Sequence, residues 1–228
     1  MTNIEWSPQR WLPQPKISQN EFECLRSEAM RGIFEAVTLI PHLADVVIKD
    51  FGVVNNQVNS NQLPYGTCGE LSKYFNIENG RSKGEKNYIE GTTPYISSGD
   101  STNSIISLID AIPEELFEAG GITVTAFGKA ALQPWAFMAR GNGGSSVRVL
   151  IPKYNMSLNE LLWFIAQINR QRWRFFYARM AIKERIANLE VAASPQALLD
   201  SGKTLSERVR IFREQLEDFI HLKTNLPV

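Results

Sequence analysis

The chain has 228 residues, and its formal net charge at pH 7 is +0, with 24 Lys and Arg against 24 Asp and Glu. Its 43% hydrophobic and 21% charged residues are typical of a folded protein with a core of its own. The balanced charge excludes a global electrostatic attraction to nucleic acid or membrane, so any such partner must meet a local patch.

No apolar run approaches the roughly 20 residues that a membrane-spanning helix needs, and the N-terminus lacks the hydrophobic region of a signal peptide. We therefore expect a cytoplasmic protein with no membrane partner. Cys24 and Cys68 belong to no CxxC pattern, and only His42 and His221 could join them as metal ligands. Because structural zinc needs about four converging ligands, we expect reduced thiols, no metal and no cofactor.

The N-terminal part of the chain predicts one helix. Residues 1–20 carry prolines and tryptophans without periodicity and predict an irregular leader. From Glu21 to Ile40, apolar residues recur at spacings of three and four, which favours an amphipathic helix. The proline that follows ends or kinks this helix, and a second short element comes next. Asn-rich and Gln-rich residues 53–66 predict a loop or linker.

The middle of the chain changes to short β-prone runs separated by Gly, Asn and Ser clusters, which predicts an irregular, mostly β globule. PEELFEAG (113–120) predicts one short helix closed by Gly120. One stretch, TTPYISSGDSTNSI (92–105), is mostly small and polar and has little to bury. It is either a surface loop or a polar finger held out toward a partner. The β-prone runs are KYFNI (73–77), TPYIS (93–97), GITVTAF (121–127) and SSVRVLI (145–151).

Helical signals return after Pro152. Ser157, with Glu160 three residues later, is typical of a capping box at the start of a helix. We expect this helix to break near Arg174, where the aromatic run RFFYAR favours a locally extended chain. The segment from Arg170 to Arg185 holds five Arg and one Lys against one Glu. Its cations are expected to face phosphates or a partner subunit, and its interleaved aromatic residues to fill the core.

The last predicted helix covers residues 205–223, after a polar connector at 194–204. Its apolar residues alternate at spacings of four and three, which is the seam of a coiled coil over about two heptads. Two heptads bury too little surface to form a strong dimer alone. The helix could pack on its own domain or pair with another subunit. We favour subunit contact, through Leu205, Val209, Phe212, Leu216 and Phe219.

The order of four segments resembles a known family. They are YGTCGELSKYFNIENGRSKG (65–84), GTTPYISSGDSTNSI (91–105), GITVTAFGKA (121–130) and the long run from SSVRVLIPK to NLEV (145–191). Together they resemble the target recognition domain of the DNA specificity subunit of type I restriction-modification systems. The family often has Asn-Gly-Ile where this chain has Asn103-Ser104-Ile105, and a Gly-Ser-x-Gly turn in place of the sequence from Gly128 to Ala131.

The resemblance implies a non-catalytic reader of double-stranded DNA with an α+β fold, an irregular mostly β globule flanked by helices and a coiled-coil-like C-terminal helix. Such a subunit directs a DNA adenine methyltransferase subunit, and in the full system a restriction subunit, to its target. With one recognition domain, this chain resembles a half subunit that forms a homodimer or hetero-oligomer. The expected parts are an N-terminal helical extension (1–60), the recognition domain (64–192), and a connector with an assembly helix (193–228).

Base reading needs short polar side chains on a rigid scaffold, and phosphate binding needs cations. The polar finger supplies the former, and the loops around it supply the latter. Taken one by one, these residues could also be ordinary solvated loop residues. The residues expected to bind DNA are Arg81, Lys83, Lys86, Ser97, Ser98, Asp100, Thr102, Asn103, Lys129, Gln133, Arg140, Arg172, Arg174 and Arg179.

No catalytic motif is complete. SGKT (201–204) ends like a P-loop, but Ala197 stands where that motif needs glycine. Neither His lies near an obvious nucleophile, and no paired carboxylates follow a strand as in metal nucleases. Two alternatives stay open: a catalytic nuclease or methyltransferase fragment whose site is assembled from distant residues, and a helical scaffold subunit of a phage-defence complex.

Overall fold

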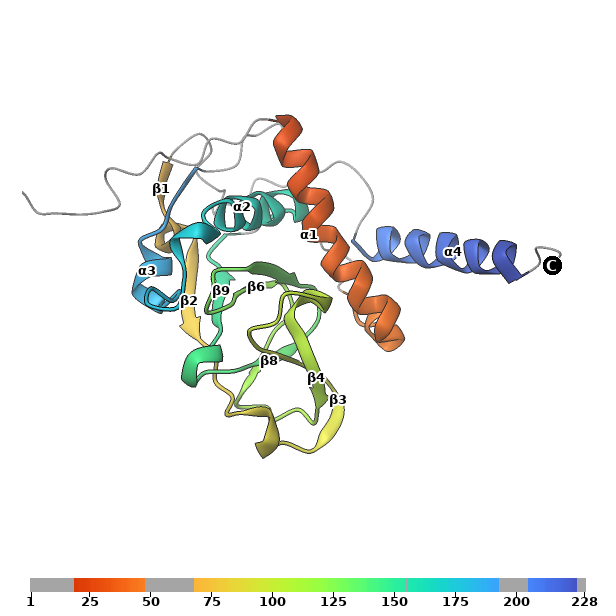
Figure 1. The fold of residues 1–228 in the computed structure, drawn as a ribbon, viewed down its shortest axis with the longest axis horizontal. Coiled ribbons are helices and arrows are strands. Elements are labelled where there is room, and N and C mark those ends of the chain that lie inside the picture. Colours follow the sequence, from red (N-terminus) through yellow and green to blue (C-terminus); the bar gives the residue numbers. More distant parts are fainter. Residues whose placement is uncertain (1–18, 48–67, 155, 193–204, 225–228) are drawn as a thin grey trace, which may run out of the picture.

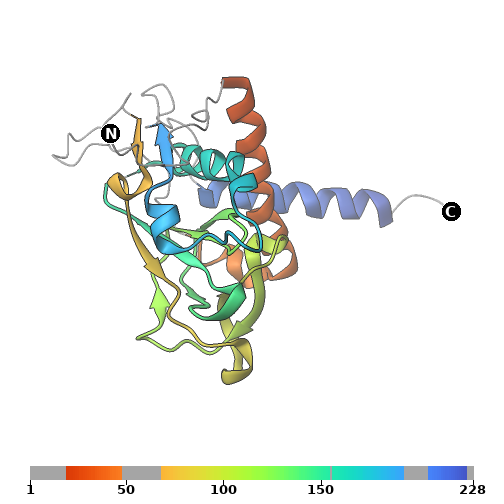
Figure 2. The ribbon, with the colours of Figure 1, turned by 60° about the vertical axis from the view of Figure 1, so that its left-hand side comes forward.

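The computed structural model describes residues 19–47, 68–154, 156–192 and 205–224. These residues form an α+β fold, with ten short strands in three small sheets and four α-helices (Figures 1 and 2). The expected fold class is therefore confirmed. The predicted loop at 53–66 and the connector at 194–204 lie outside the described residues, as does most of the predicted leader.

The central sheet has four antiparallel strands in the order β2-β9-β6-β7. Every residue of β6 and β7 is buried, so this part of the sheet is covered on both faces. Helices α1 and α2 both pack against β7, and the ring of Phe137 lies against Gly121 of β6. The strands are β2 (Phe75–Asn79), β6 (Gly121–Val124), β7 (Ala130–Gln133) and β9 (Arg148–Pro152).

A second sheet has the order β4-β3-β8-β5, in which only β3 and β8 run parallel. Its strands are β3 (Glu90–Ile96), β4 (Ile105–Ile109), β5 (Leu116–Phe117) and β8 (Phe137–Ala139). The helix predicted at 113–120 is wrong, because Leu116 and Phe117 pair with β8 instead. Phe117 stacks on Phe137 at 5.4 Å, and this packing outweighs the helix propensity of one short glutamate-rich run.

A third sheet joins the two ends of the mixed domain. Strand β1 (Cys68–Glu70) pairs antiparallel with β10 (Glu190–Ala192), so the chain enters and leaves the domain at one place. Figure 1 shows this pair beside the short helix α3 (Lys183–Ala187).

Helix α1 (Gln19–Leu39) confirms the periodicity of the N-terminal segment. It lies across α2 (Leu158–Arg170) and buries Ile33, Ala36 and Val37 against the body of the protein (Figure 1). The proline-induced end is also confirmed, because a 3-10 turn at Pro41–Ala44 follows α1.

Helix α4 (Leu205–Thr224) starts beside α1 and then runs away from the body, as both views show (Figures 1 and 2). Val209 is buried, and the ring of Phe212 stacks on Phe34 of α1 at 4.4 Å and 11°. Two of the predicted seam residues therefore pack inside this chain. Leu216 is half-buried further along the helix. The side chains of Leu205 and Phe219 lie outside what the structure describes.

Within the described residues, none of the helices combines the length and apolar character required to cross a bilayer. The same residues contain no group of His, Cys, Asp or Glu side chains placed to hold a metal ion.

The predicted capping box starts α2. The Ser157 hydroxyl accepts the Glu160 amide at 3.2 Å, and the Glu160 carboxylate accepts the Ser157 amide at 2.7 Å. Both residues are buried, so no water replaces these bonds when one partner is removed.

We predict that Ser157→Ala lowers the free energy of unfolding by about 1–2 kcal/mol, because the buried Glu160 amide loses the hydroxyl that accepts its hydrogen bond. Urea denaturation followed by circular dichroism measures this change. Ser72→Ala, at a surface position, is the control. Equal stability of the two variants would contradict a structural role for the box.

Candidate nucleic-acid interface

The stretch expected to form a polar finger is partly buried, with Asp100 and Ser101 exposed at its tip. In this polar stretch (residues 97–104), Ser97, Asn103 and Ser104 are buried. Three successive residues adopt left-handed backbone angles, with φ of 49° at Thr102, 55° at Asn103 and 65° at Ser104. Ser104 occupies the position where the family often has glycine, which this conformation favours. Its hydroxyl donates to the Gly99 carbonyl at 2.8 Å, a bond that glycine could not make.

The Asn103 side chain is held in a network of buried amides. It is 2% exposed, and its Nδ2 donates to the Leu132 carbonyl and to Oε1 of Gln133. Gln133 is 0% exposed and donates back to the Asn103 carbonyl at 3.1 Å and to the Thr123 hydroxyl at 2.9 Å. Side chains so enclosed cannot reach a base edge. The sequence predicted that Asn103 and Gln133 contact DNA, whereas in this structure both side chains bond within the fold.

Helix α1 covers this network from outside. A Cβ at Gly32 would lie 3.0 Å from Oδ1 of Asn103, so the glycine lets the helix backbone approach closely. One turn later, the Glu35 carboxylate accepts the Thr102 amide at 3.3 Å. The polar stretch is therefore a docking surface for α1, which the sequence did not indicate.

Three of the predicted DNA-binding residues do come together, although they are far apart in the sequence. Arg172 places Nη2 at 2.9 Å from both carboxylate oxygens of Asp100. The Lys129 ammonium donates to the backbone carbonyl of the same aspartate. Burial lowers the pKa of Lys129, while Asp100 acts in the opposite direction. With α1, these residues line a cavity of about 290 Å³. The cations of this cluster are bonded mainly to the protein itself.

The serines at the start of the polar stretch are not presented to a duplex either. Ser97 is 3% exposed, and the hydroxyl oxygen of Ser98 is buried with no hydrogen-bond partner in the described structure. The sequence predicted that both serines contact DNA, whereas in this structure their hydroxyl groups lie within the fold.

A second group of predicted cations lies at the other end of the molecule, around the 3-10 turn Glu85–Asn87. Lys83 and Lys86 are exposed there. Arg81 is exposed too, but it pairs with Glu78 at 2.8 Å and lies 4.1 Å from the Phe117 ring. We call Arg81, Lys83, Lys86 and the half-exposed Arg140 the loop surface.

Two tyrosine hydroxyl groups hold the backbone of the loop surface by hydrogen bonds. The Tyr95 hydroxyl donates to the Lys83 carbonyl, and the Lys83 amide donates to the Tyr88 hydroxyl at 2.6 Å. Burial raises the pKa of Tyr95 to about 12, with Arg140 opposing the shift. The Tyr95 hydroxyl therefore stays protonated and holds the backbone that carries Lys83.

The segment between α2 and α3, residues 171–182, contains the remaining predicted cations. We call it the α2–α3 connector. Arg174 is 8% exposed, and burial lowers its pKa. The sequence predicted a DNA contact for Arg174, whereas in this structure its side chain is enclosed by the protein. Arg179 is half-exposed.

The aromatic residues of this connector are only partly core residues, in contrast to the sequence interpretation. Phe175 is buried, but Trp173, Phe176 and Tyr177 are 61%, 54% and 86% exposed. The helical periodicity stops at Arg170, where α2 ends. The end of the periodicity could have indicated that these aromatic residues are exposed, because residues outside a helix have no helix face that packs on the core.

The arrangement is thus a small mixed domain with two exposed basic surfaces and a partly buried polar stretch that contacts α1. The family model described as "Type I restriction modification DNA specificity domain" matches residues 67–192. The chain belongs to this family. As a specificity domain of a restriction-modification system, it is a non-catalytic part of an enzyme complex.

One curated relative is the "Type II restriction enzyme BgcI specificity subunit S.BcgI" of Heyndrickxia coagulans. It is 26% identical over 136 residues, which are 58% of this chain and 39% of the relative. The matched part of the chain therefore spans 39% of the length of that relative.

Solved structures of S subunits are also similar. The type I restriction-modification S subunit from M. genitalium is 12% identical with a TM-score of 0.46, over 89% of this chain and 54% of that chain. The HsdS subunit from Thermoanaerobacter tengcongensis is 16% identical with a TM-score of 0.43, over 92% of this chain and 50% of that chain.

We predict that Asn103→Ala lowers the free energy of unfolding by about 1–3 kcal/mol, because Gln133 and the Leu132 carbonyl lose buried partners. Thermal and urea denaturation measure the change, with Asn76→Ala on the exposed side of β2 as the control. A stable Asn103→Ala variant with altered base preference would instead restore the base-reading role.

Proposed function

We propose that this chain reads a double-stranded DNA sequence and directs a DNA adenine methyltransferase, and with it a restriction subunit, to that sequence. The observation that carries the proposal is the match of residues 67–192 to the DNA specificity domain. The specificity subunit from Heyndrickxia coagulans supports the same class of function.

DNA would meet the protein at its exposed cations. Lys83 and Lys86 on the loop surface and Arg179 on the connector are free of ion pairs among the described residues. A chain with no net charge needs such local groups to hold the phosphate backbone, since no global field attracts it. Base contacts would then come from loop residues next to these cations, and the polar stretch would support the scaffold.

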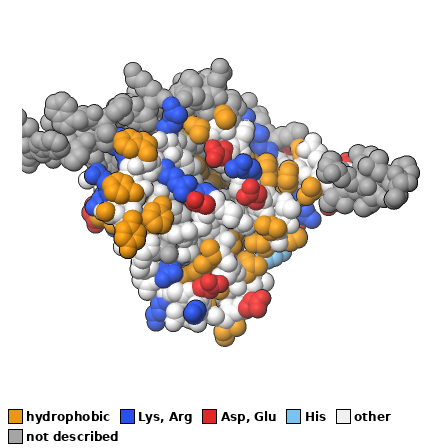
Figure 3. Space-filling view, viewed as in Figure 1, with side chains coloured by type: hydrophobic (Ala, Val, Ile, Leu, Met, Phe, Trp, Pro, Cys, Tyr) orange, Lys and Arg blue, Asp and Glu red, His pale blue; other side chains and the backbone are white. Residues whose placement is uncertain are grey.

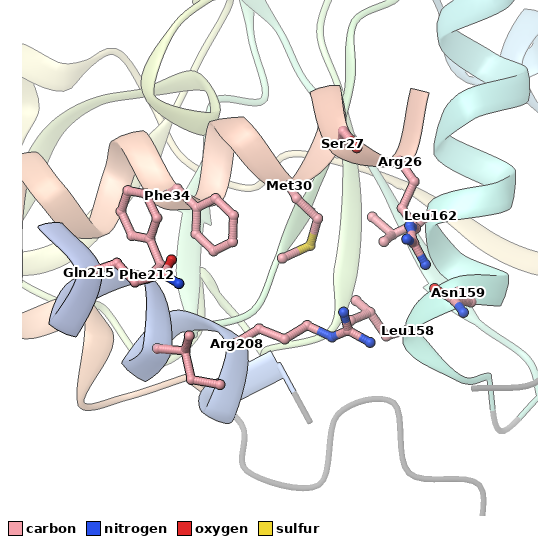
Figure 4. Close-up of a pocket in the computed structure, with 11 residues that line it drawn as sticks. Arg26, Ser27, Met30, Phe34, Leu158, Asn159, Leu162, Arg208, Phe212 and Gln215 are labelled. Carbon is pink, nitrogen blue, oxygen red and sulfur yellow. The ribbon is translucent and has the colours of Figure 1, made fainter. Parts of the chain in front are cut away.

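The helices outside the matched region would serve assembly. We propose that the recognition domain covers residues 64–192 and that 1–60 and 193–228 contact a second copy or a methyltransferase subunit. A groove of about 390 Å³ opens between α1, α2 and α4. Figure 4 shows Met30, Phe34 and Phe212 on its walls, with Arg208 reaching across it toward α2. A dimer would hold two readers a fixed distance apart and give a two-part target.

The proposal is tested by selecting bound duplexes from a random library, with the purified chain alone and with an adenine methyltransferase subunit co-expressed from the same source. We expect one sequence to be enriched. Absence of enrichment in both experiments would favour a scaffold subunit. Cleavage or methylation of DNA by the chain alone, with magnesium and S-adenosylmethionine, would contradict a non-catalytic reader.

We predict that Arg179→Gln weakens binding to all duplexes, because one phosphate contact is lost. The negative slope of log affinity against log salt should become shallower by about 1. Fluorescence anisotropy at several salt concentrations measures both. Arg210→Gln, which removes an exposed cation of α4 paired with Glu214, is the charge-matched control and should leave the slope unchanged. Identical slopes for the two variants would exclude Arg179 from the interface.

We predict that the chain is dimeric at micromolar concentration and that Leu216→Glu makes it monomeric, because a charge in the outer part of the α4 seam cannot be desolvated. Light scattering coupled to size exclusion measures the mass. Glu217→Gln, at the next and exposed position, is the control. A wild-type monomer would leave only assembly with a different subunit.

A further inference from the structure

Three aromatic side chains of the α2–α3 connector project from the surface. Trp173, Phe176 and Tyr177 are 61%, 54% and 86% exposed, and we call them the aromatic knuckle. Phe127, on the adjacent turn between β6 and β7, is 38% exposed. Figure 3 shows hydrophobic side chains gathered on the side where Figure 1 places α3, with basic side chains at their edge. Exposed aromatic clusters of this kind mark contact surfaces.

The knuckle is held rigidly from below. Phe176 and Arg179 exchange two backbone hydrogen bonds, of 3.3 and 2.8 Å, which close a tight turn with Tyr177 at its tip. Phe175, in contrast, is buried against Gly128 of the β6–β7 turn. The Ala181 amide bonds to the Ala126 carbonyl at 2.8 Å. Little conformational freedom is therefore left to lose when a partner binds.

The charges around the knuckle indicate which partner fits. Arg179 and Lys183 flank it, and neither forms an ion pair within the described part of the chain. The Arg172 side chain pairs with Asp100 but is still 41% exposed. Glu184 is the sole acidic residue between positions 170 and 185. Aromatic faces framed by cations match a nucleic acid, which offers stacked bases between rows of phosphates.

We propose that the aromatic knuckle inserts its side chains against a base step of duplex DNA while the flanking cations hold the phosphates. This rests on the proposed function and adds a mode of contact to it. The insertion would unstack the step locally, because aromatic wedges open and kink duplexes. It would contribute affinity and distortion rather than sequence preference, since every base has a face on which to stack. An adenine methyltransferase must take its target base out of the helix, and a pre-opened duplex lowers that cost.

The test uses the full chain and a duplex enriched by it, or a random duplex at low salt. Tyr177→Ala and Trp173→Ala should each weaken binding by roughly 5- to 150-fold with the salt slope unchanged, since no charge is removed. Ile106→Ala, which removes a 43% exposed apolar side chain of β4, is the matched control and should bind like the wild type. Circular dichroism confirms that each variant is folded.

A second measurement reports the insertion itself. With 2-aminopurine placed at successive positions of the duplex, wild-type binding should raise the fluorescence at one step, and Tyr177→Ala should abolish the rise. Wild-type affinity in both knuckle variants would overturn the inference while leaving the proposed function intact, and would assign the knuckle to a protein partner. Loss of affinity without a fluorescence rise would overturn the insertion. Failure of the wild type to bind any duplex, both alone and with the methyltransferase subunit, would overturn both proposals.

Discussion

The buried amide network between Asn103 and Gln133 is the constraint on which the arrangement of the domain depends. It fastens the loop between β3 and β4 to strand β7 of the other sheet, and it adds polar contacts to the hydrophobic core that the two four-stranded sheets share. The Asn103 side chain of this network is also the group that Gly32 of α1 approaches closely. A polar group buried this deeply is stable only when all its partners are present, which makes the position intolerant of change.

The positions of polar and aromatic residues are the opposite of what the sequence predicted. Ser97, Asn103 and Ser104, which seemed suited to touch DNA, lie inside, and the amide of the neighbouring Thr102 donates to Glu35 of α1. Large aromatic residues that seemed suited to the core lie outside, on a turn held by backbone bonds. Recognition in this specificity domain is therefore proposed to start from exposed cations and rigid aromatic faces, with the polar stretch serving as their support.

The sequence predicted the helices that depend on neighbouring residues alone. The spacing of apolar residues predicted α1, and Ser157 with Glu160 predicted the start of α2. The family resemblance predicted the domain and its class of function. The burial of Asn103 could not be predicted, because its partner lies 30 residues away and becomes visible only when β7 is placed. The helix expected at 113–120 failed for a similar reason, since pairing with β8 overrides a weak local preference.

We propose that DNA binds at the connector and the loop surface and not at the polar stretch. Hydrogen exchange of the chain, with and without its enriched duplex, tests it most directly. The account predicts new protection of backbone amides at 171–182 and 80–88, and unchanged exchange at 97–104, where amides such as that of Ser104 are already bonded within the fold. Protection gained at 97–104 without any at 171–182 or 80–88 would contradict it.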